Sequence, residues 1–223
     1  MYIQKIRNFF NKRFDSNKFE KIYDLYLPKK GIFVEVGAFD GISFSASINL
    51  LKQNYLGYYI EPVEENFKNL KKNLSKYKNA ILYQYAIGEK NTDIDIYNIG
   101  PFSTVNPSTL NLFKKFYFTK KEFAKNKGSE KVFQITFDDF LTKINIKPNF
   151  ELLIIDIEGN EENLFKGFKL EYYKPKMIII ELHDNNIAYK DFHDRDNRIN
   201  SLILNAGYKI VYKDLSDTIY VQS

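Results

Sequence analysis

The chain has 223 residues, a formal net charge of +5 and no cysteine. The lack of cysteine excludes disulfides, iron–sulfur clusters, thiolate metal sites and cysteine nucleophiles. Hydrophobic residues make up 44% of the chain, which is enough for the core of one large α/β domain. A basic surface favours acidic partners, but lysine is abundant together with Asn, Ile, Tyr and Phe and forms no long block. Coding bias is therefore the preferred origin of the charge.

Residues 1–30 are predicted to form an N-terminal helical extension that ends at Pro28. In residues 1–14 an aromatic face is flanked by Lys and Arg. We expect this face to pack on the sheet or on a second subunit, and peripheral contact with the inner face of a membrane is the alternative. The chain has no apolar run near the ~20 residues that span a bilayer and no signal-peptide pattern, so we expect a cytoplasmic protein.

From residue 31 apolar strands alternate with amphipathic helices, which predicts an α/β fold with a mostly parallel sheet and helices on both faces. Ligands of such sheets bind beyond the carboxyl ends of the strands. Two final strands predict an antiparallel C-terminal hairpin, an ending typical of class I methyltransferase Rossmann-like sheets rather than of dehydrogenases. The predicted strands span residues 32–36, 57–61, 80–87, 92–98, 132–135, 151–156, 177–181, 208–212 and 218–222, with helices starting near Ser43, Val63 and Phe137 and a last helix before Gly207.

The first chemical motif is VEVGAFDG, where a buried strand runs into a glycine loop and then a helix. The dinucleotide pattern G-x-G-x-x-G is missing, because the loop contains only Gly37 and Gly41. The carboxylates of Glu35 and Asp40 would repel a pyrophosphate but suit a ligand with an ammonium and a sulfonium group. The loop therefore favours S-adenosylmethionine over NAD, and its cofactor-binding candidates are Glu35, Gly37, Ala38, Phe39, Asp40, Gly41 and Ser43.

The second motif places Glu61 at the end of the next strand, directly before Pro62. A carboxylate at this position can accept hydrogen bonds from both hydroxyls of a ribose. The alternative is a solvated acid at a strand end. We expect Glu61 and Pro62 to contact the cofactor.

Acidic groups also follow the two most apolar strands. Asp156 and Glu158 emerge at the carboxyl end of the strand at residues 151–156, and Glu181 and His183 at the carboxyl end of the strand at residues 177–181. Asp156, Glu158 and His183 are the catalytic candidates, and Asp156 is also a cofactor-binding candidate. All four residues as a set could hold a divalent metal. The alternatives are a structural Asp156, a helix-capping Glu158 and a hydrogen-bonded loop histidine. The second histidine, His193, lies in a charged loop and is interpreted as structural.

These blocks, together with YAIGEKNTDIDIY, ITFDDFL and PKMIIIEL in the same order, resemble the FkbM-type methyltransferase family over residues 31–183. The resemblance implies a class I S-adenosylmethionine-binding sheet and O-methylation of sugars, glycans or secondary metabolites. It also implies that Glu35, Gly37 and Gly41 flank the methionine part of the cofactor, that Glu61 holds the ribose and that Ala86 lies by the adenine. Members commonly carry a lysine where this chain has Ile155, so a role for that lysine does not carry over.

We therefore expect residues 31–223 to form an O-methyltransferase domain for a hydroxyl of a sugar, nucleotide-sugar or surface glycan. His183 or Glu158, with Asp156 nearby, would accept the proton of the acceptor hydroxyl. The alternative is a divalent metal, bound by Asp156, Glu158, Glu181 and His183, that assists this deprotonation. Residues 99–131 are long, irregular and rich in Lys, Phe and Tyr, and are predicted to cover the acceptor, with Lys114, Lys115 and Phe116 near the mouth.

Two other functions compete with this prediction. The positive charge suggests a nucleic-acid (RNA) methyltransferase, but the N-P-P-aromatic motif expected after residues 152–156 is replaced by DIEG, so no stable nucleic-acid partner is expected. The second alternative is a non-catalytic Rossmann-like module that binds no cofactor. The presence of the cofactor-binding candidates Gly37, Gly41 and Glu61 argues against it.

Overall fold

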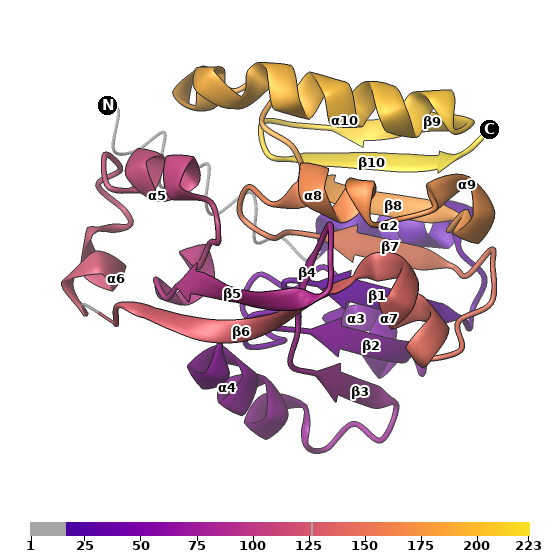
Figure 1. Ribbon diagram of the computed structural model, residues 1–223. Helices are drawn as coiled ribbons and strands as arrows, with labels where there is room; N and C mark the ends of the chain where they lie inside the picture. Colours follow the sequence, from indigo (N-terminus) through magenta and orange to yellow (C-terminus); the bar gives the residue numbers. More distant parts are fainter. Residues whose placement is uncertain (1–16, 126) are drawn as a thin grey trace.

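The computed structural model describes residues 17–125 and 127–223, and its centre is a seven-stranded sheet (Figure 1). The strand order is β3-β2-β1-β7-β8-β10-β9, and β10 runs antiparallel to both of its neighbours, whereas the other pairs are parallel. The strands are β1 (Ile32–Val36), β2 (Leu56–Ile60), β3 (Ala80–Tyr83), β7 (Leu152–Ile155), β8 (Met177–Glu181), β9 (Tyr208–Lys213) and β10 (Asp217–Gln222). The predicted parallel sheet and C-terminal hairpin are confirmed.

Helices cover both faces of this sheet because alternate residues of each buried strand point to opposite sides. In β7, Leu153 and Ile155 pack on one face, with α7 (Phe137–Lys143), α8 (Glu161–Lys166), α9 (Leu170–Tyr173) and α10 (His193–Asn205). Leu152 and Ile154 pack on the other, with α2 (Asn17–Tyr26), α3 (Ile48–Lys52) and α4 (Glu64–Leu74). No helix in the described ranges is long and apolar enough to cross a membrane.

The N-terminal part of the described chain packs on the sheet. In α2, Phe19 and Tyr23 are buried in the core, and Tyr23 Oη donates a hydrogen bond of 2.8 Å to Ala46 O. The aromatic face predicted in residues 1–14 lies outside the described residues.

A second, three-stranded sheet branches from the first, with the order β4-β6-β5. It consists of β4 (Ala86–Gly88), β5 (Thr92–Tyr97) and β6 (Ser129–Thr136). The segment between β5 and β6 carries η1 (Gly100–Phe102), α5 (Pro107–Phe113) and α6 (Lys120–Ala124). Helices α5 and α6 lie beyond one end of the large sheet (Figure 1). The short helix η2 (Ile187–Phe192) follows β8.

Three local predictions are wrong. The strand expected at residues 80–87 is two strands, because β3 pairs with β2 whereas β4 leaves for the second sheet. The helix expected from Ser43 begins only at Ile48, because Asp40 accepts the backbone N–H groups of Ile42 and Ser43 and Phe44 has a left-handed φ of +66°. Residues 99–131 are not irregular, since they contain α5, α6 and the start of β6.

Candidate active site

Two adjoining cavities open at the carboxyl ends of β1 and β7, where the chain order of the large sheet reverses. Parallel sheets bind their ligands at such a point. The first cavity is lined by Glu61, Pro62, Ala86 and Asn66 among others. The second is lined by Glu35, Ala38, Ser43 and Glu181 among others. The two cavities meet, because Gly37, Phe39, Pro101, Asp156 and Glu158 line both.

The glycine loop is shaped by the close approach of Gly37 to the end of β7. Gly37 has a φ of +86°, and a Cβ atom there would lie 1.8 Å from the backbone oxygen of Asp156. The backbone N–H groups of Gly37 and Ala38 both donate to Ile60 O at 3.0 Å. Only glycine fits this position, because any side chain would displace the backbone that carries Asp156.

Two of the cofactor-binding candidates of the loop line neither cavity. Gly41, with a φ of +73°, faces Leu70 and Leu74 of α4. Asp40 instead closes a turn, in which its carboxylate accepts the N–H and hydroxyl of Ser43, each at 2.7 Å. Both residues shape the loop from outside the cavities.

Glu61 is buried at the end of β2 and faces the first cavity. Its Oε1 accepts the Val63 N–H at 2.9 Å and the Asn66 amide at 3.2 Å, and its Oε2 accepts the Phe39 N–H at 2.9 Å. Burial raises the pKa of Glu61 to about 7, although these hydrogen bonds oppose the shift. A carboxylate has about four lone-pair sites, so Oε2 can accept one more donor such as a ligand hydroxyl.

Glu35 is buried in β1 and lines the second cavity. The Ser47 hydroxyl donates a short hydrogen bond to its Oε2. Burial raises the pKa of Glu35 from 4.5 to about 7. The charged carboxylate is therefore disfavoured here until a cationic group or a proton neutralises it.

Replacement of Glu35 by Gln is expected to flatten the dependence of stability on pH. Because the folded-state pKa lies above the unfolded one, the neutral carboxyl stabilises the fold at low pH, and this contribution is lost as the pH rises through about 7. Melting temperatures of the cofactor-free protein between about pH 5 and 8 should fall less for Glu35→Gln than for wild type. The exposed Glu171→Gln is the matched control, and equal slopes for wild type and Glu35→Gln would contradict the assignment.

A cluster of three carboxylates lies where the two cavities meet. One oxygen each from Asp156, Glu158 and Glu181 can be chosen so that all three lie within 4.8 Å of one another. Two of these groups follow β7 and the third ends β8, so the neighbouring strands bring them together as predicted from their strand-end positions. The cluster can accept a proton from an acceptor or hold a cation.

His183 lies behind this cluster and lines neither cavity. Its Nδ1 lies 3.0 Å from Leu215 O, so Nδ1 carries a hydrogen, since a carbonyl oxygen only accepts. Its Nε2 lies 3.3 Å from Glu181 Oε1, and its ring stacks on Tyr189 at 3.7 Å. Both ring nitrogens of His183 thus face protein groups. This arrangement fits a residue that orients Glu181 better than it fits the predicted role of His183 as proton acceptor.

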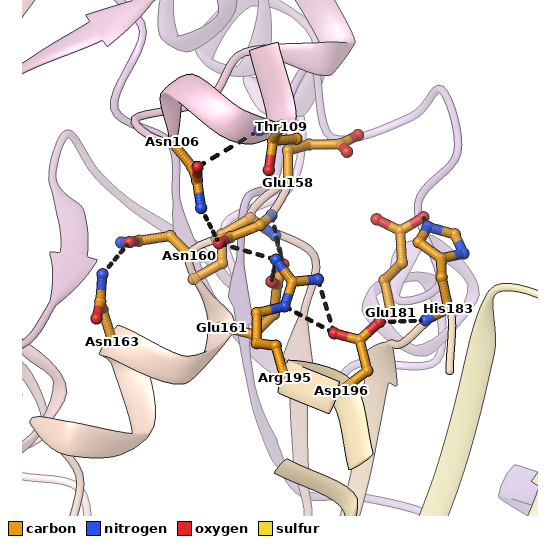
Figure 2. Close-up of polar contacts among 12 residues, drawn as sticks. Asn106, Thr109, Glu158, Asn160, Glu161, Asn163, Glu181, His183, Arg195 and Asp196 are labelled. Atoms are coloured by element: carbon orange, nitrogen blue, oxygen red, sulfur yellow. Dashed lines mark hydrogen bonds and ion pairs between the residues drawn. The ribbon is translucent and has the colours of Figure 1, made fainter. Parts of the chain in front are cut away.

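The segment between β5 and β6 covers the carboxylate cluster. The Thr104 hydroxyl donates to Glu158 O at 2.7 Å, and the Asn106 amide donates to Gly159 O at 3.2 Å (Figure 2). Phe102, Phe118 and Lys121 of this segment line the second cavity. The predicted mouth residues Lys114, Lys115 and Phe116 line neither cavity, and Phe116 packs instead against Phe118 and Tyr189.

Sequence reasoning missed the polar side chains that hold the carboxylates and loops of the site. Asn66 and Ser47 hold Glu61 and Glu35 by hydrogen bonds. Arg195 donates to the backbone oxygen of Gly159, next to Glu158, and Asp196 accepts the backbone N–H of His183 (Figure 2). Arg195 and Asp196 stand in the charged stretch HDRD, which looks like a solvated surface. Only the buried position of Asp196 in the fold distinguishes this pair from ordinary surface charges.

The strand order, the glycine loop and the acid at the end of β2 define a class I methyltransferase fold with a cavity at its switch point. The profile of the methyltransferase FkbM domain matches residues 35–210. The chain therefore belongs to the FkbM methyltransferase family and is an S-adenosylmethionine-dependent methyltransferase.

A solved structure supports the fold. A candidate O-methyltransferase from Klebsiella pneumoniae has a TM-score of 0.53 and 12% identity, over 94% of this chain and 80% of that chain. A precorrin-6y C5,15-methyltransferase from Geobacter metallireducens is more distant, with a TM-score of 0.47 and 12% identity, over 92% and 89%. No curated protein sequence matches the chain.

Proposed function

We propose that the protein transfers a methyl group from S-adenosylmethionine to a hydroxyl of a sugar or glycan. The observation that carries the proposal is the junction of the two cavities at Asp156 and Glu158. The first cavity suits the adenosine part of the cofactor, with Glu61 toward the ribose and Ala86 beside the base. The second suits the methionine part and the acceptor, so the methyl group would pass between them at the carboxylates.

The acidic residues fit the charges of this cofactor. Its ammonium and sulfonium groups are cationic, and Glu35 and Asp156 line the cavity that would hold them. The cofactor supplies an activated methyl group with a good leaving group. The protein must orient the acceptor and accept its proton as the oxygen–carbon bond forms and the carbon–sulfur bond breaks.

We assign the proton acceptor to Glu158. Glu158 lines both cavities, and its backbone oxygen is held by Thr104 of the covering segment. Its φ of +50°, followed by +98° at Gly159, bends the loop sharply after β7. A divalent cation on Asp156, Glu158 and Glu181 is the alternative way to lower the pKa of the acceptor hydroxyl, and loss of activity on chelation would favour it.

The second cavity favours an uncharged acceptor over a phosphorylated one. Among the described residues its lining includes the carboxylic side chains of Glu35, Glu122, Asp156, Glu158, Glu181 and Asp217 and a single lysine, Lys121. Carboxylates accept hydrogen bonds from hydroxyls but repel phosphates. Phe102 and Phe118 provide apolar ring faces for the C–H side of a sugar.

An acceptor panel tests this function. Transfer of a labelled methyl group is measured with neutral methyl glycosides, a sugar phosphate, a nucleotide-sugar and an unmethylated RNA. We expect a neutral glycoside to react best. A preference for RNA, with binding that weakens steeply with salt, would favour the competing nucleic-acid function.

Glu61→Ala is expected to weaken S-adenosylmethionine binding by roughly 2–3 kcal/mol, or about 30–150-fold, because it removes a charge-assisted hydrogen bond to the ribose. Calorimetry measures this directly. The matched control is Glu64→Ala, which removes an exposed carboxylate three residues further on that pairs with Lys68 at 2.6 Å. Unchanged affinity of a folded Glu61→Ala protein would remove Glu61 from the ribose site.

A further inference from the structure

A buried ionic network lies behind the carboxylate cluster, at the start of α10 (Figure 2). Arg195 donates from Nη1 to Gly159 O at 3.1 Å, and its Nε and Nη2 each lie 2.7 Å from Asp196 Oδ1. The arginine therefore links α10 to the loop that carries Asp156 and Glu158. Gly159 follows Glu158 directly, so the fixed carbonyl lies one peptide from the proposed proton acceptor.

Asp196 makes the matching link to the other strand end. Its side chain is fully buried, and Oδ2 accepts the backbone N–H of His183 at 2.9 Å. His183 in turn faces Glu181 through Nε2. The carboxylate of Asp196 thus joins the loop after β8 to the guanidinium that holds the loop after β7.

Glu161 completes the network. It is 1% exposed, accepts the N–H groups of Ile157 and Gly159 at 3.3 and 3.1 Å, and lies 3.8 Å from Arg195 Nη1. Burying several charges is unfavourable unless each is paired and hydrogen-bonded, and apolar residues would join two helices at least as well. The network is therefore not explained by helix packing alone.

We propose that Arg195 and Asp196 are positioning residues for methyl transfer, which fix the Asp156–Glu158 loop relative to the Glu181–His183 loop. The proposal rests on the function proposed above. Neither residue lines a cavity, so neither touches the reactants, and both act through the carboxylates. The bidentate fork of arginine suits this role, since a displacement of about 1 Å at reacting groups can lower a rate by about 10²-fold.

The chain provides a matched control one turn later on α10. Arg198 Nε donates to Glu162 at 2.8 Å and also joins α10 to α8, but both partners are solvent-exposed in part and neither contacts a loop of the cluster. Arg195→Lys keeps the charge and loses the fork, and Arg198→Lys makes the same change at the control pair. Asp196→Asn keeps the shape of the side chain but replaces one carboxylate oxygen by an amide group. It therefore weakens either the hydrogen bond from Arg195 or the one from the His183 N–H.

The first test needs no acceptor. Hydrogen exchange is followed by mass spectrometry with S-adenosylmethionine bound. We expect Arg195→Lys and Asp196→Asn to speed exchange in residues 156–160 and 181–186 together, and Arg198→Lys in neither. Faster exchange in one loop alone, no change in either, or an even rise over the whole chain would each overturn the proposal.

The second test separates positioning from binding. With a neutral methyl glycoside as acceptor, Arg195→Lys should lower kcat by about 10–100-fold and change cofactor affinity by less than about threefold. The double variant should lose little more than either single one, because the two residues act as a unit. Wild-type kcat in Arg195→Lys would overturn the positioning role, whereas a wild type inactive on the whole acceptor panel would contradict the proposed function instead.

Discussion

Glu158→Gln is expected to lower turnover by about 10²–10⁴-fold at saturating cofactor, the usual contribution of a general base. The substitution keeps the size of the side chain and removes the group that would accept the proton. Glu158 lines both cavities, and the hydrogen bond from Thr104 goes to its backbone oxygen, so this link does not depend on the carboxylate. S-adenosylmethionine affinity, measured by calorimetry, should therefore change much less than turnover.

Glu162→Gln is the control for this experiment. Glu162 lies four residues further on in α8, pairs with Arg198 on the surface and lines neither cavity. It should keep wild-type turnover. If Glu158→Gln is as active as Glu162→Gln while Glu181→Gln is inactive, Glu181 accepts the proton of the acceptor hydroxyl. If chelation abolishes the activity of wild type and of Glu162→Gln, a bound cation is required.

The fold could be predicted largely from local patterns. β1 and β8 have the bounds predicted for them, because strands buried on both faces are apolar at nearly every position and end sharply at polar residues. The same rule placed Asp156, Glu158 and Glu181 at one edge of the sheet. Parallel neighbours end together, so residues that follow separate strands converge without any long-range information.

The direction of a side chain could not be predicted in this way. His183 follows β8 as a catalytic histidine would, but the hairpin turn presents Leu215 O to Nδ1, and Nε2 then faces Glu181. That arrangement depends on β9 and β10, which are more than twenty residues away in the sequence. The burial of the Arg195–Asp196 pair could not be predicted for the same reason, because a charged stretch carries no sign that it will be buried.

The covering segment shows a third limit. Residues 99–131 have no dominant period, since α5 and α6 are short and the segment packs through the rings of Phe102, Phe113 and Phe118 rather than through one apolar stripe. The segment was predicted to cover the acceptor, but the residues predicted near the mouth, Lys114, Lys115 and Phe116, do not line either cavity. Aromatic contacts between non-neighbouring turns decided which side chains face inward.

Gly37→Ala is expected to destabilise the fold by about 2–4 kcal/mol, which lowers the melting temperature by roughly 5–15 °C, and to abolish measurable cofactor binding. Two effects add. The φ of +86° disfavours any L residue, and the new methyl group would lie 1.8 Å from the backbone oxygen of Asp156. That oxygen cannot rotate away as a side chain would, because the Asp156 N–H is bonded to Val36 O at 3.0 Å. β1 and β7 must therefore separate at the point where the two cavities meet.

Gly128→Ala isolates the first effect. Gly128 has a similar φ of +70°, but a methyl group there would have no atom of the described residues within 4 Å, so only the backbone preference is lost, about 1 kcal/mol. Thermal unfolding and calorimetry with S-adenosylmethionine are measured on both variants. A Gly37→Ala protein that binds cofactor as well as Gly128→Ala would show that the two strand ends can separate without harm, and the close approach of Gly37 to Asp156 would then not be what shapes the cofactor site.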